Sequence, residues 1–154
     1  MVKLDKALRR GHLWGSCLML FAAGCGAQPN VPPRAIQLHQ KWALQPGAEV
    51  AGLRISGGLG DISIELKGKS VRAPFNGKVQ PNREDCVVFS SSEVPAYLFR
   101  LCGLKRPQLG DLQEGEVIGS GEALQFAALR RQPDGSWAIV EPAVDLLERT
   151  VRQE

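Results

Sequence analysis

Residues 86–102 read CVVFSSSEVPAYLFRLC and predict a β-hairpin. Two runs rich in apolar, β-branched and aromatic residues flank a polar segment that contains Pro95. If the chain reverses near Pro95, Cys86 and Cys102 face each other, and thiols on paired strands can reach disulfide distance. The N-terminal residues described below predict export to an oxidising compartment, and in such a compartment we expect a Cys86–Cys102 disulfide. Two buried free thiols are the alternative.

Short strand-like segments lie on both sides of this hairpin. Each is bounded by Gly, Pro, Asn or Asp, which is typical of strands joined by turns. The expected strands are residues 62–66, 71–74, 77–79, 116–118, 124–129 and 136–140. Pro142 can begin a final helix that ends near Val151. Many short strands with one terminal helix predict a mainly β domain, a small β sandwich or barrel with a C-terminal helix.

The N-terminus has the features of an export signal. Basic residues within 1–12 precede an apolar run at 13–23, LWGSCLMLFAA, which is too short to span a bilayer and suits a signal peptide. Residues 22–25, AAGC, resemble the lipobox of bacterial lipoproteins. The resemblance implies that Cys25 is the lipid-attachment residue.

The leader divides the chain into three expected parts. Residues 1–24 are a lipoprotein signal peptide, 25–47 a lipidated tether and linker, and 48–154 the β domain. The resemblance implies a protein of the cell envelope, held on the membrane by its lipid anchor and facing the periplasm or the exterior. An ordinary secretory signal, a twin-arginine signal at Arg9-Arg10 and a short buried helix are the alternatives.

The net charge and the number of histidines are both lower in the chain that remains after the leader is removed. The formal net charge of +3 equals the excess of basic over acidic residues within 1–24. The remaining chain is neutral, which gives no indication of nucleic-acid binding. Of the 2 histidines, only His39 lies outside the leader, so a zinc site with several imidazoles is excluded. A zinc site of Cys86, Cys102 and His39 is an alternative to the disulfide.

Several segments resemble, in order, the M23 (LytM-like) peptidase domain. Residues 71–79, VRAPFNGKV, are similar to that family's strand–turn–strand pattern, and residues 86–102 take the place of its central hairpin. Residues 109–121, LGDLQEGEVIGSG, look like its glycine-rich loop and strand, and 140–142, VEP, like its C-terminal end. The resemblance implies a duplicated-hybrid-motif fold, which is a lipoyl-like small β sandwich or barrel.

The same resemblance locates the zinc site of the family at positions that have lost its ligands. The His-x-x-x-Asp pair falls on Gly57 and Asp61, and the His-x-His pair falls on Ala123 and Gln125. Because only Asp61 keeps the ligand of the family, the resemblance implies a pseudo-peptidase with no metal, no catalytic residue and no cofactor. A turn residue ahead of a strand is the plain interpretation of Asp61. An active zinc endopeptidase is a remote alternative.

Loss of the charged metal shell is expected to leave a more apolar cleft. The residues expected to line this cleft are Tyr97, Phe99, Arg100, Leu124 and Phe126. The resemblance implies a binding or regulatory module for peptidoglycan or a cell-wall hydrolase, because degenerate relatives activate cell-wall amidases. A structural accessory lipoprotein of a membrane complex is the alternative function.

Overall fold

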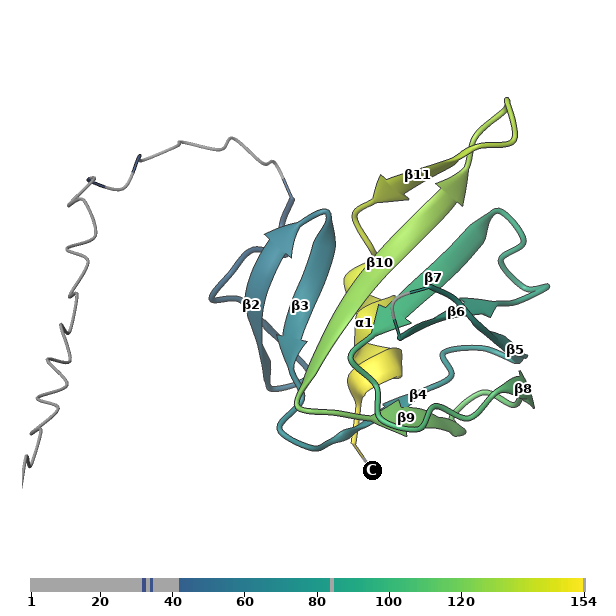
Figure 1. Cartoon of the computed structure of the whole chain (residues 1–154), viewed down its shortest axis with the longest axis horizontal. Coiled ribbons are helices and arrows are strands. Elements are labelled where there is room, and N and C mark those ends of the chain that lie inside the picture. The colour runs from purple at the N-terminus through teal and green to yellow at the C-terminus, as the bar shows by residue number, and fades with distance from the viewer. Residues whose placement is uncertain (1–31, 33, 35–41, 84, 154) are drawn as a thin grey trace, which may run out of the picture. The chain divides into compact units, whose positions relative to one another are not determined.

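The computed structural model describes residues 32, 34, 42–83 and 85–153 (Figure 1). In this part of the chain the domain is mainly β, with one short C-terminal helix, as the sequence predicts. The elements are β1 (Glu49–Val50), β2 (Leu53–Leu59), β3 (Asp61–Glu65), β4 (Ser70–Arg72), β5 (Gly77–Pro81), β6 (Cys86–Ser90), β7 (Tyr97–Cys102), β8 (Gly110–Leu112), β9 (Val117–Ser120), β10 (Ala123–Arg131), β11 (Trp137–Val140) and α1 (Val144–Val151).

The strands form one large antiparallel sheet and one small one. The large sheet has the order β1-β2-β3-β10-β7-β6-β5-β8, and β11 also pairs with β10. Strands β4 and β9 form a separate two-stranded sheet. Within the described residues, the order ends at β8 without returning to β1, so the large sheet is open and does not close into a barrel.

The central hairpin has the predicted register. Cys86 is opposite Cys102, and Ser90 is opposite Leu98, so the chain reverses around the Val94-Pro95 pair. The two cysteines form the expected disulfide, with their Cα atoms 4.1 Å apart. The disulfide sulfurs cannot serve as thiolate ligands, so the structure excludes the Cys-Cys-His zinc alternative.

The strand–turn–strand segment 71–79 crosses from one sheet to the other. Strand β4 pairs with β9, whereas β5 pairs with β6 and β8. Gly77 begins β5 in close contact with β6: an added Cβ would overlap the carbonyl oxygen of Ser90 and the ring of Phe89. This position therefore requires glycine for close backbone approach.

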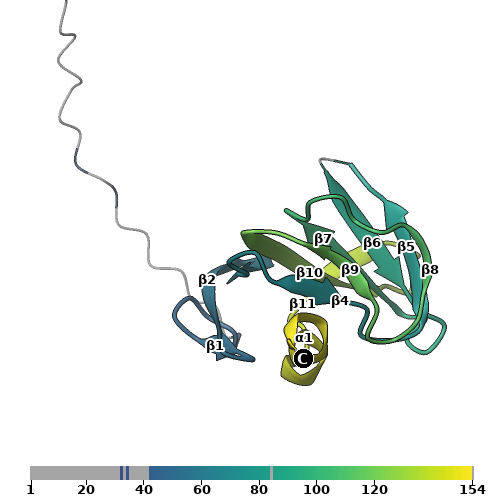
Figure 2. The same ribbon diagram turned by 90° about the horizontal axis from the view of Figure 1, so that it is seen from below.

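The core lies on one face of the large sheet, the face covered by α1 (Figure 2). The ring of Phe99 lies between those of Phe89 and Phe126, with centroids 6.4 and 5.8 Å away. Leu147 and Val151 of the helix are fully buried in the same cluster. Because strand side chains alternate between faces, the residues next to these aromatic side chains point to the opposite face, which we call the outer face.

The two ends of the domain differ from the sequence prediction. Strand β2 is missing from the predicted set, because Gly57-Gly58 removes the side chains that mark a strand. Pro142 does not begin the helix: Ala143 is the N-cap and α1 starts at Val144. Leu44, within the predicted linker, is buried in the core and its N–H donates to Glu141 Oε1 at 3.0 Å.

The predicted signal peptide and the lipid-attachment residue Cys25 lie outside the described residues. So does His39. Within the described residues, the one helix is too short and too polar to cross a bilayer.

Candidate functional site

The sheet register places on the outer face the four positions that the resemblance aligns with the zinc site of the family. Gly57 and Gln125 both lie opposite Ser63, on either side of β3. Ala123 lies opposite Glu65, two residues further along β3. Asp61 precedes Ser63 by two residues on the same strand, so it shares the face. Residues from β2, β3 and β10 therefore share the outer face, but of these four positions only Asp61 and Gln125 line a common cavity, and Gly57 and Ala123 do not.

The guanidinium of Arg100, on β7, lies next to Asp61 on the outer face. Arg100 lies opposite Ala127 of β10, between the rows that contain Phe99 and Leu101, so its side chain is on the outer face. Its Nη2 donates to Oδ1 and Oδ2 of Asp61, over 2.8 Å each. The side chains are 35% and 27% exposed. Such a charge-assisted contact on a half-buried carboxylate is stronger than an exposed ion pair.

A polar cavity of about 300 Å³ lies around this ion pair. We call it the outer-face cavity; its lining residues are Asp61, Asn82, Arg83, Cys86, Arg100, Cys102 and Gln125. The Cys86–Cys102 disulfide forms part of the cavity wall. Arg100 is two residues before Cys102, so the disulfide that closes the hairpin also restrains the strand that carries Arg100. The cavity offers guanidinium and amide donors, with one carboxylate.

The residues at the outer-face cavity do not fit a zinc ion. Zinc in a catalytic site takes imidazole, thiolate or carboxylate ligands and keeps one position for water. Asp61 is the only such group that lines the cavity in the described part of the chain, and both of its oxygens already accept from Arg100. No cluster of three or more His, Cys, Asp and Glu suited to a metal occurs among the described residues.

The structure divides the predicted cleft between the core and two cavities. Leu124 and Phe126 are fully buried in the core. Tyr97 and Phe99 face the core side of β7. Arg100, the next residue after Phe99, faces the other side and lines the outer-face cavity. Residues 97–100 therefore do not line one cleft, because neighbouring residues of a strand face opposite ways.

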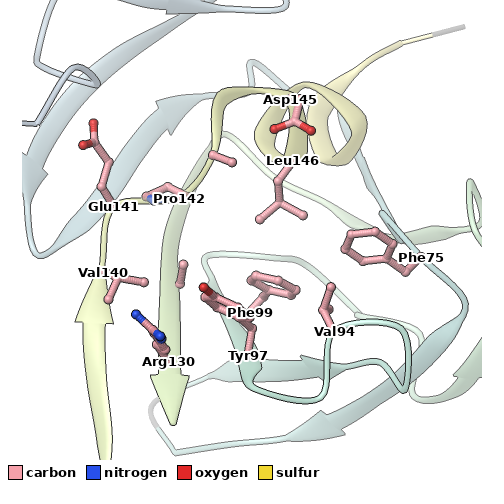
Figure 3. Close-up of a pocket in the computed structure, with 12 residues that line it drawn as sticks. Phe75, Val94, Tyr97, Phe99, Arg130, Val140, Glu141, Pro142, Asp145 and Leu146 are labelled. Carbon is pink, nitrogen blue, oxygen red and sulfur yellow. The ribbon is translucent and has the colours of Figure 1, made fainter. Parts of the chain in front are cut away.

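Tyr97 and Phe99 instead line a second cavity, which we call the helix cavity (Figure 3). It has a volume of about 320 Å³ and lies where the β11–α1 connection passes over β7 and β10. Leu146 points into it from α1, and Phe75 forms a wall from the β4–β5 turn (Figure 3). The sequence prediction missed Phe75 and Leu146; an aromatic residue in a turn between strands is the signal that could have indicated Phe75.

Comparison with protein-family models and with curated proteins finds no match for this chain.

Proposed function

We propose that this chain is a lipid-anchored, non-catalytic M23-like (LytM-like) module of a bacterial cell envelope, which binds peptidoglycan or a cell-wall hydrolase. One observation carries the proposal. The positions that correspond to the zinc ligands of the family lie on one face of the sheet, and there Asp61 accepts from a guanidinium. Arg100 thus supplies the positive charge next to the carboxylate that the family keeps for its metal.

The topology is consistent with the finer fold in this proposal, the duplicated hybrid motif. The segment 71–79 changes sheets at its turn, and the glycine-rich segment 109–121 supplies β8 and β9, which pair with β5 and β4. These two segments, which are far apart in the sequence, therefore pair with each other in both sheets.

The chemistry of the outer-face cavity favours binding over hydrolysis. Hydrolysis by the family mechanism needs a metal-bound water whose pKa falls near neutrality. A guanidinium has no open coordination position and stays protonated, so it can neither bind that water nor accept its proton. It can orient a carbonyl or a carboxylate through charge-assisted hydrogen bonds. The proposed module therefore holds its ligand without cutting it.

A photo-crosslinking experiment in the native cell tests this proposal. A photoreactive amino acid replaces Gln125 at the cavity or, as the control, the exposed Arg54 of β2. We expect muropeptides or a cell-wall hydrolase among the adducts of the Gln125 variant and not of the Arg54 variant. Adducts with subunits of a membrane complex alone would replace the proposal with the accessory-lipoprotein alternative.

Two further measurements test the anchor and the lack of activity. Fatty-acid labelling should depend on Cys25 and disappear in Cys25→Ala. Purified protein incubated with peptidoglycan and added zinc should release no soluble muropeptides. Stoichiometric zinc in the purified protein, together with such release, would identify a peptidase and overturn the proposal.

A further inference from the structure

The outer-face cavity has more positive than negative charge. Arg83 and Arg100 line it with two guanidinium groups, and Asp61 contributes the single carboxylate. Arg83 is exposed and forms no ion pair with another described residue. Asp85 is close in sequence but does not line the cavity. The charge balance among the described lining residues therefore favours an anion.

Arg100 keeps hydrogen-bonding capacity after it has bound Asp61. An arginine has five N–H donors, and the two bonds to Asp61 both come from Nη2. Nε is buried and has no hydrogen-bond partner in the described part of the chain. This unmet buried donor is costly, and Nη1 of the same guanidinium donates to no other described residue, so Nη1 is the donor that a ligand in the cavity can use.

The amides at the cavity give a peptide ligand further contacts. Gln125 on β10 and Asn82 after β5 line the cavity on different sides of Arg100. Amide side chains can donate to one peptide group and accept from another. The volume of about 300 Å³ is at the small end of ligand pockets, which suits the last one or two residues of a chain.

We propose that the outer-face cavity binds the terminal carboxylate of a short peptide, with Arg83 and Arg100 as its donors. The chemistry of the lining gives the carboxylate. The source rests on the proposed function: in peptidoglycan, the stem peptides end in a free D-alanine carboxylate. Asp61 acts as a positioning residue, because it holds the Arg100 guanidinium in one orientation.

Isothermal titration of the full-length protein in detergent tests the ligand chemistry. The probes are N-acetyl-D-alanyl-D-alanine, its C-terminal amide and N-acetyl-L-alanyl-L-alanine. We expect the D,D acid to bind at least about tenfold more tightly than its amide, because charge-assisted hydrogen bonds are lost in the amide. Equal binding of acid and amide, or no binding of either, would overturn the carboxylate site. Tighter binding of the L,L acid would overturn the cell-wall source.

Substitutions at the cavity test the assigned donors. Arg83→Gln should weaken binding of the D,D acid about tenfold, whereas Arg54→Gln, with the same change in net charge on an exposed strand position, should leave it unchanged. Arg100→Gln should abolish binding, and Arg83→Gln keeps the test available if that variant fails to fold. Equal effects of Arg83→Gln and Arg54→Gln would show a general charge effect and contradict the site.

Failure of this inference is distinguishable from failure of the proposed function. Retention of the protein on whole peptidoglycan without discrimination between acid and amide would leave the binding module in place and remove the carboxylate site. Discrimination between acid and amide without retention on peptidoglycan would do the reverse.

Discussion

Arg100 Nη2 donates to both carboxylate oxygens of Asp61 over 2.8 Å, and this contact joins β7 to the start of β3 across the outer face of the sheet. Strands β4, β5 and β6 lie between β3 and β7 in the chain, whereas in the sheet only β10 lies between them. The pair thus bridges β10, over Ala127, and fixes the geometry of the cavity beside it.

The Asp61–Arg100 pair should contribute measurably to stability. A double-mutant cycle with Asp61→Asn and Arg100→Gln should give a coupling free energy of about 1 kcal/mol in urea unfolding, because the pair is half-buried and chelating. The exposed pair Lys105–Glu122, with side chains 71% and 76% exposed and 3.9 Å between charged atoms, is the matched control. Its coupling should be close to zero. Equal couplings for the two pairs would show that Asp61–Arg100 behaves as an ordinary surface contact.

The Cys86–Cys102 disulfide should stabilise the domain through the hairpin that it closes. Replacement of both residues by alanine is expected to lower the free energy of unfolding by about 3 kcal/mol, the chain-entropy value for a loop of this length. Urea unfolding of the variant against wild type measures the difference. Mass spectrometry of the unreduced, alkylated protein provides the control, since both residues should escape alkylation. Alkylation of both in the unreduced protein would contradict the disulfide.

Restoring imidazoles should restore a metal site if the resemblance is correct. The triple variant Gly57→His/Arg100→Ala/Gln125→His frees Asp61 and surrounds it with two histidines, the ligand set of the family. We expect it to bind one zinc ion per chain, measured by metal analysis after dialysis. In the control, Arg54→His replaces Gly57→His and should bind none. A folded triple variant that binds no more zinc than this control would count against the resemblance.

The turn between β10 and β11 contains a carboxylate with a lowered pKa. The hydroxyl and the N–H of Ser136 both donate to Asp134 Oδ1, at 2.6 and 2.9 Å, and these bonds hold the pKa of Asp134 below its ordinary value. A lowered pKa in the folded state means that the contribution to stability is present above the unfolded pKa and is lost as the pH falls through the folded pKa. Ser136→Ala should raise the pKa of Asp134 in an NMR titration, and an unchanged titration midpoint would refute this assignment.

The hairpin could be predicted from sequence, and the cleft could not. Cys86, Cys102 and the turn residues between them fix the hairpin's register locally, and the structure has that register. The predicted cleft combined Phe99 with Arg100, although neighbouring strand residues point to opposite faces. In the structure Phe99 lines the helix cavity and Arg100 the outer-face cavity.

The Asp61–Arg100 ion pair at the outer-face cavity also could not be predicted from the sequence. Asp61 and Arg100 are 39 residues apart, and their contact depends on the long-range pairing of β3 and β7 with β10. Gly57 lies in a strand that the sequence does not mark, because glycine carries no apolar side chain. Local patterns therefore predicted the class of fold, while the site required the register of the whole sheet.

Co-sedimentation of the purified protein with peptidoglycan sacculi tests the central claim most directly. The wild-type protein should sediment with sacculi that have been stripped of other proteins, and Arg100→Glu/Gln125→Ala should stay in the supernatant while keeping its circular dichroism spectrum. The control variant Arg54→Glu should sediment like wild type. Sedimentation of the double variant to the same extent as wild type would contradict the claim that the outer-face cavity is the binding site.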